Sequence, residues 1–171
     1  MSQHDKELAV ELTNLMPLEG WRKLEEELHA LSRMNAGVFD AQGKRLTDYA
    51  NWGNTLCPRI KSNPDGLQAI CACANQVLMR RAAQEERPIL EECDAGLVKL
   101  LAPVIRDGQF LGVAGCCGSR LQGSAVDTHY IARTTGIPEI EVIRLAGAVP
   151  AISRERAEEI VDWIVKRLAA L

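Results

Sequence analysis

The sequence predicts an α+β fold, with a PAS-like antiparallel sheet, flanking helices and a C-terminal three-helix segment. Segments with strand character come in pairs that short turns connect, and such hairpins build antiparallel sheets. The chain then becomes wholly helical from about residue 124 onward. Its 171 residues, 47% apolar and 25% charged, suit one globular domain.

The chain opens with helical patterns. Residues 4–16 carry a short helical pattern that Pro17 ends, and we treat 1–17 as an N-terminal helical extension of a sensory domain at 18–171. A stronger helix is predicted over 18–34, because four apolar residues share one stripe. They are Trp21, Leu24, Leu28 and Leu31.

A strand pair and an irregular segment follow. Residues 36–40 and 45–49 predict two strands around a turn at Gln42-Gly43. Residues 50–66 contain several glycines and prolines and are predicted to be a long loop with room for one helical turn. Loops of this length in compact domains usually carry function.

The middle of the chain predicts a helix and a second set of strands. Residues 67–84 form a helical pattern, followed by extended segments at 88–90 and 97–105. Asp107-Gly108 is a strong two-residue hairpin signal that leads into a glycine-rich strand at 110–116.

Three helices are predicted to end the chain. Ser124-x-x-Asp127 can cap the first, Gly136-Ile137-Pro138 starts the second, and Ser153 caps the third. The last helix carries an apolar stripe that either closes the core or packs on a second copy in a homodimer. The stripe comprises Ile160, Ile164, Leu168 and Leu171, with Trp163 beside it.

Composition limits the class of partner. The net charge of −3 gives no bulk attraction to nucleic acid or anionic lipid, so neither partner is expected. The first residues lack the pattern of a signal peptide, and no apolar run approaches the ~18 residues of a membrane helix. We therefore expect a cytoplasmic protein, in which thiols stay reduced.

The six cysteines are the most unusual feature, because they stand at the ends of separate predicted elements. Cys57, Cys71, Cys93 and one of Cys116 or Cys117 could supply four thiolates to zinc, copper(I) or an iron–sulfur cluster. Neighbouring residues on a strand face opposite sides, so only one of the last two can join. The alternatives are buried apolar thiols or a thiol-based redox sensor without metal.

A ligand cavity is the second predicted site. Its expected lining is apolar with a few polar groups, the usual composition of a small-molecule pocket. The candidates are Phe39, Trp52, Asn54, Ile60, Gly112 and Gly115. The alternative is that the two aromatic residues belong to the core.

DNA binding and catalysis are weaker alternatives. Residues 125–147 copy the apolar and glycine spacing of a helix-turn-helix, but its second helix would present Glu139 and Glu141 where a recognition helix is basic. None of His4, His29 and His129 neighbours a cysteine in sequence, and we expect no enzyme activity.

The chain resembles the PocR sensory domain over roughly residues 18–168. The blocks that carry the resemblance are Trp52…Cys57-Pro58-x-Ile60, Cys71, Cys93-x-Ala95-Gly96-Leu97, Pro103-Val104-Ile105 and Phe110-Leu111-Gly112. The resemblance implies a PAS-like sensor that binds a small molecule such as a diol between sheet and helices. Such domains are commonly fused to an output module. None follows here, so we expect the signal to pass to a partner protein or a second copy.

Overall fold

The computed structural model describes residues 10–171, which form an α+β fold around an antiparallel sheet, as the sequence predicted. Part of the expected helix at 4–16 lies outside the described residues, and the remainder contains a single helical turn, α1 (Leu12–Leu15). The sheet order is β1-β4-β3-β2. The strands are β1 (Asn35–Asp40), β2 (Ile89–Glu92), β3 (Val98–Arg106) and β4 (Gln109–Leu121).

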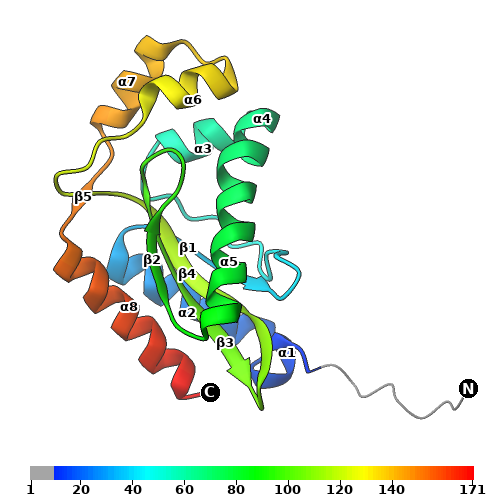
Figure 1. Cartoon of the computed structure of the whole chain (residues 1–171). Helices are drawn as coiled ribbons and strands as arrows, with labels where there is room; N and C mark the ends of the chain where they lie inside the picture. The colour runs from blue at the N-terminus through cyan, green and yellow to red at the C-terminus, as the bar shows by residue number, and fades with distance from the viewer. Residues whose placement is uncertain (1–9) are drawn as a thin grey trace, which may run out of the picture.

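Helices cover both faces of this sheet and extend beyond one end of it (Figure 1). Helices α2 and α8 pack on one face, and α5 packs on the other. Helices α3 (Leu56–Lys61), α6 and α7 form a separate cluster beyond the sheet, with its own apolar core. The larger helices are α2 (Leu18–Ser32), α5 (Cys73–Glu85), α6 (Thr128–Thr135), α7 (Glu139–Gly147) and α8 (Arg154–Ala169).

The alternation of side chains along the two long strands separates the faces. Leu100 on β3 and Cys116 on β4 face α2 and α8 in the main core. Leu101 and Val113 face α5. Cys117 therefore points to the face opposite Cys116, the geometry predicted for adjacent strand residues.

The β3–β4 hairpin confirms its turn signal. Asp107 and Gly108 have φ values of 51° and 76°, which is the backbone of the two-residue turn that favours Asp-Gly. β4 is longer than predicted, and its far end pairs in parallel with β5 (Ala151–Ile152), a strand that the sequence did not predict.

The predicted strand at 45–49 is wrong, since only a single bridge joins Arg45 to Phe39. Side chains form hydrogen bonds with the backbone groups of β1 that a neighbouring strand would otherwise pair with. Asn51 accepts from the Ala36 N–H at 2.6 Å and donates to the Ala36 carbonyl at 3.0 Å. The Val38 N–H donates to the buried Glu25 carboxylate at 2.9 Å.

The predicted helix at 67–84 is present but irregular. It begins as α4 (Pro64–Gly66), continues as the π-helical turn η1 (Leu67–Ala72) and becomes α5 without a break. π-Turns inside helices frequently mark functional sites. A further short helix, α3 (Leu56–Lys61), lies in the segment predicted as a loop.

The stripe of α8 closes the core. Ile160 and Ile164 are fully buried against the sheet together with Trp21 of α2. This helix face is therefore not free to form a dimer.

Candidate functional site

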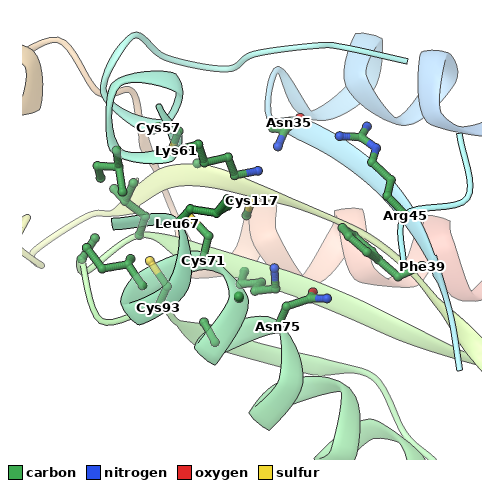
Figure 2. A pocket seen from close by; sticks show the side chains of 18 of the residues that line it. Asn35, Phe39, Arg45, Cys57, Lys61, Leu67, Cys71, Asn75, Cys93 and Cys117 are labelled. Atoms are coloured by element: carbon green, nitrogen blue, oxygen red, sulfur yellow. The ribbon is translucent and has the colours of Figure 1, made fainter. Parts of the chain in front are cut away.

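A cavity of about 280 Å³ lies between the sheet and the helical segments α3, η1 and α5. Figure 2 shows its side chains converging from β1, β4, these helices and the loop before β3. Apolar groups make up much of the wall, and charged and amide side chains interrupt it. The apolar members include Phe39, Ile60, Leu67, Ile70, Ala74, Ala95 and Leu97.

The floor of the cavity is a row of three residues on adjacent strands. Cys117 on β4 pairs directly with Asn35 on β1 and with Lys99 on β3. Directly opposed residues project from the same face of a sheet, and all three line the cavity. The antiparallel register therefore brings an amide, a thiol and an ammonium group together.

Four cysteines line the same cavity from four separate segments. Cys57 belongs to α3, Cys71 to η1, Cys93 to the loop before β3, and Cys117 to β4. Asn54 holds α3 against β4, because its Nδ2 donates to the Gly118 carbonyl at 2.6 Å and its Oδ1 accepts from the Cys57 N–H at 2.7 Å. The Asn54 amide also donates to Cys57 Sγ at 3.2 Å.

Burial keeps three of the cavity thiols protonated. Desolvation, followed by the neighbouring Cys117, raises the pKa of Cys57 to about 12. Desolvation raises the pKa of Cys71 to about 11, although Lys61 opposes the shift. The pKa of Cys93 is also raised by burial, despite backbone hydrogen bonds from Leu97 and Ala95 that favour its thiolate. These three thiols are therefore neutral near pH 7.

The other two cysteines do not reach this cavity. Cys116 is buried in the main core, and desolvation raises its pKa to about 12. Cys73 is exposed on the outer side of α5. Within residues 10–171, no three His, Cys, Asp or Glu side chains are arranged to hold one metal ion.

The charged residues that line the cavity are all basic: Arg45, Lys61 and Lys99. Arg45 Nη2 donates to the carbonyls of Ala36 and Tyr49 and lies 3.7 Å from Glu25 Oε1. Lys61 Nζ lies 5.1 Å from the centre of the Trp52 ring. Lys99 is 8% exposed, and its ammonium has no hydrogen-bond or ion-pair partner among the described residues.

Two buried amides also face the cavity. Asn35 and Asn75 are 7% and 8% exposed, and each has a carbonyl oxygen without a hydrogen-bond partner in the described structure. The Nε of Arg45 is likewise unpartnered. Unpartnered buried polar groups are uncommon in folded proteins and call for an explanation.

The structure brings only some of the predicted ligand residues to the cavity. Phe39 and Ile60 line it, whereas Trp52 is 43% exposed outside it. Asn54 lies behind the wall and positions Cys57.

The predicted ligand residues Gly112 and Gly115 lie against the backbone of neighbouring strands and do not line the cavity. A Cβ on Gly112 would lie 2.1 Å from the Phe39 carbonyl oxygen, and one on Gly115 would lie 1.9 Å from that of Leu100. Close strand packing therefore explains both glycines.

Sequence reasoning missed Asn35, Asn75 and Lys99. A signal for Lys99 was available, because it is the single charge in the otherwise apolar run of residues 97–105. A charge at such a position is rarely buried without a partner. The two amides carried no comparable signal.

The helix-turn-helix-like segment folds as the helix pair α6–α7. The N-terminal turn of α7 carries Glu139 and Glu141, and its most exposed apolar side chains are Ile140 and Ile143. Neither described histidine, His29 or His129, lines the cysteine cavity. No helix in residues 10–171 combines the length and the apolar character that crossing a bilayer requires.

Comparison with known proteins identifies the family. The family model described as "Sensory domain found in PocR" matches residues 14–170, which is nearly the whole chain. No curated protein and no solved structure matches the chain. The protein therefore belongs to the PocR sensory domain family.

Proposed function

We propose that this sensory domain binds a small organic effector in the cavity and passes the bound state to a partner chain. The observation that carries the proposal is the cavity itself, with an apolar wall and a few buried polar groups that lack partners. Its volume of about 280 Å³ is near the lower end of the roughly 300–1,000 Å³ of small-molecule sites, which favours a small effector.

Helix α3 offers a route for the signal. It contributes Cys57, Ile60 and Lys61 to the cavity. Arg59 on the same helix forms an ion pair with Glu141 of α7 at 2.9 Å. A shift of α3 on binding would therefore be felt in the α6–α7 pair.

The effector can drive such a shift only by binding one arrangement of α3 better than another. The surface of α7 beyond the ion pair exposes Ile140 and Ile143. A partner protein or a second copy that binds this surface of α7 would respond to the shift.

A thermal-shift screen tests the proposal. The purified chain is heated with small alcohols, diols and carboxylic acids, and a true effector raises the midpoint of unfolding in a saturable way. At 100 times its dissociation constant a ligand adds about 2.7 kcal/mol to the free energy of unfolding. Failure of every compound to raise the midpoint at high concentration contradicts an organic effector.

A metal or iron–sulfur cofactor held by cysteines is the second candidate. It is favoured by the presence of Cys57, Cys71, Cys93 and Cys117 around one cavity, because soft thiolates suit zinc, copper(I) and iron–sulfur clusters. Hydrogen bonds to the sulfurs of Cys57 and Cys93 favour their thiolate forms. The four side chains would have to close on the metal, since no three described donors are placed to share one ion.

Anaerobic purification separates the two candidates. Stoichiometric iron, zinc or copper, lost in the Cys57→Ser variant but retained in Cys73→Ser, supports the cofactor. Colourless protein without these metals contradicts it. A disulfide among the four cavity cysteines after mild peroxide treatment of metal-free protein would instead indicate thiol-based redox sensing.

A further inference from the structure

We propose that the effector is a short-chain hydroxycarboxylic acid whose carboxylate binds the Lys99 ammonium and whose hydroxyl group donates to one of the amide oxygens of Asn35 and Asn75. This proposal rests on the proposed function, since it names the chemical class that the same cavity takes. It follows from the charge, the unsatisfied polar groups and the apolar wall.

The charge of the cavity calls for an anion. Its lining contains Arg45, Lys61 and Lys99 but no aspartate or glutamate. The first two have alternative partners, Glu25 at 3.7 Å from Arg45 and the Trp52 ring at 5.1 Å from Lys61 Nζ. Lys99 is the deepest of the three and is left uncompensated.

Lys99 cannot obtain a carboxylate from its own sheet. Its neighbour on β2 is Glu91, which is turned to Arg81 at 2.9 Å and is half exposed. Across β4 its neighbour is Cys117. The Phe39 ring, 5.9 Å from Lys99 Nζ, provides only a weak attraction. The Lys99 ammonium thus lacks a partner of opposite charge among the described residues, and a carboxylate from a ligand would supply one through a charge-assisted hydrogen bond.

Cys57 and Cys71 do not provide the missing negative charge. Burial raises the pKa of Cys57 to about 12 and that of Cys71 to about 11, so both are neutral near pH 7. These two thiols therefore leave the Lys99 charge in place for a ligand.

The amide oxygens call for a hydrogen-bond donor on the same molecule. Asn35 lies one strand from Cys117 and two strands from Lys99 on the cavity floor, and Asn75 faces the floor from α5. Both have an unpartnered Oδ1. A carboxylate has no donor to give them, whereas a hydroxyl group has one. A second ammonium would meet repulsion from Lys99, which makes a hydroxyl the better choice.

The apolar part of the cavity wall indicates the chemistry of the rest of the ligand. Ile60, Leu67, Ile70 and Leu97 offer aliphatic surface, which suits a short hydrocarbon chain. A single uncompensated ammonium matches a monocarboxylate, whereas a phosphate would need the denser set of donors typical of phosphate sites.

Calorimetric titration of the full chain with 2-hydroxypentanoate, 1,2-pentanediol and pentanoate tests the assignment. These probes share one carbon skeleton and differ only in the carboxylate or the hydroxyl. We expect 2-hydroxypentanoate to bind best, and each of the other two to bind at least about tenfold more weakly. Equal or tighter binding of the diol overturns the assignment of a carboxylate but leaves an organic effector in place. Failure of all three to bind overturns this proposal, whereas the proposed function is judged by the wider screen.

The Lys99→Met variant provides the second readout, with the exposed Lys23→Met as its matched control. We expect Lys99→Met to weaken 2-hydroxypentanoate binding at least about tenfold and to leave diol binding unchanged. Without ligand, its midpoint of unfolding should equal or exceed that of the wild type, because the substitution breaks no ion pair or hydrogen bond of the Lys99 side chain in the described structure and places an apolar side chain at a position that is 8% exposed. A clear loss of stability in Lys99→Met would assign Lys99 a structural role and overturn the proposal.

Discussion

Lys99 lies directly opposite Cys117 in the β3–β4 ladder, and both side chains face the cavity. The next strand places Asn35 beside Cys117 in the same row. The thiol of Cys117 thus separates a cation from an amide within this row. This row forms the polar floor of the site that we assign to the effector.

The six cysteines should react with iodoacetamide in a fixed order. Cys73 is exposed and should label first at pH 8. Cys57, Cys71 and Cys116 should label more slowly, because the thiolate is the nucleophile and their pKa values are raised to about 12, 11 and 12. Mass spectrometry of peptides over time gives the order, with urea-unfolded chain as the control. Labelling of Cys57 as fast as Cys73 would contradict the buried site.

Asn54 should prove to be a positioning residue for Cys57. Asn54→Ala loses the bond to the Gly118 carbonyl at 2.6 Å and the bond from the Cys57 N–H at 2.7 Å. We expect a loss of about 1–3 kcal/mol in the free energy of unfolding. Alkylation of Cys57 should become faster, because exposure of its sulfur relieves the desolvation that dominates its raised pKa and so outweighs loss of the Asn54 hydrogen bond that favours the thiolate. Chemical denaturation and peptide mapping measure the two effects.

Asn63→Ala is the matched control for this variant. Asn63 also caps a helical turn and donates to a distant carbonyl, that of Thr135, at 2.7 Å. The Asn63→Ala variant should lose a similar free energy of unfolding without changing the alkylation rate of Cys57. Equal acceleration in both variants would show that general loosening, and not the Asn54 contact, controls the thiol.

Stability should fall at alkaline pH because of the buried thiols. Below about pH 9, Cys116 is protonated in both the folded and the unfolded chain. Between 9 and about 12 the unfolded chain releases its proton and the folded chain keeps it. The free energy of unfolding therefore falls by about 1.4 kcal/mol per pH unit for each such thiol.

Urea unfolding at pH 8, 9 and 10 measures this slope. Cys116→Ala should reduce the slope, whereas Cys73→Ala, which removes an exposed thiol, should not. Identical slopes in all three proteins would argue against a protonated Cys116 in the core.

The Arg59–Glu141 ion pair should couple the cavity to α7. With an effector from the screen, amide exchange in residues 139–147 should slow in the wild-type chain. Glu141→Gln removes the ion pair that joins α3 to α7 at 2.9 Å and should abolish most of this change. Affinity should change less than about threefold, since the pair is partly exposed and lies outside the cavity.

Glu139→Gln is the control on the same helix, because Glu139 is exposed and lies 3.7 Å from His129 of α6, whereas Glu141 pairs with α3. Hydrogen-exchange mass spectrometry provides the readout. Undiminished protection of α7 in Glu141→Gln would exclude this route for the signal.

Local sequence signals predicted most of the fold. The turn at Asp107-Gly108 and the stripe of α8 were both visible in the sequence and hold in the structure. The predicted strand at 45–49 does not form, because the side chains of Asn51 and Glu25 accept hydrogen bonds from the backbone of β1. Both residues are more than ten positions from their partners in β1, so this pairing was not visible in the local sequence. The π-turn in η1 was invisible, since six residues do not distinguish a π-helical period from an α-helical one.

The site was predictable only in part. The convergence of Cys57, Cys71 and Cys93 was expected from their positions at element ends, and the cavity does contain them. The row of Asn35, Cys117 and Lys99 depends on strand register, which a single sequence does not reveal. Trp52 was an expected lining residue, yet it packs under Lys61 on the outside.

Calorimetric titration of a cavity-filling variant tests the central claim most directly. Ala74 lines the cavity, whereas Val77 lies on the same helix and is 51% exposed. Using the effector that stabilises the wild-type chain, we predict one site per chain in wild type and in Val77→Phe, and no binding in a folded Ala74→Phe. Wild-type affinity in Ala74→Phe would contradict the assignment of this cavity as the sensory site.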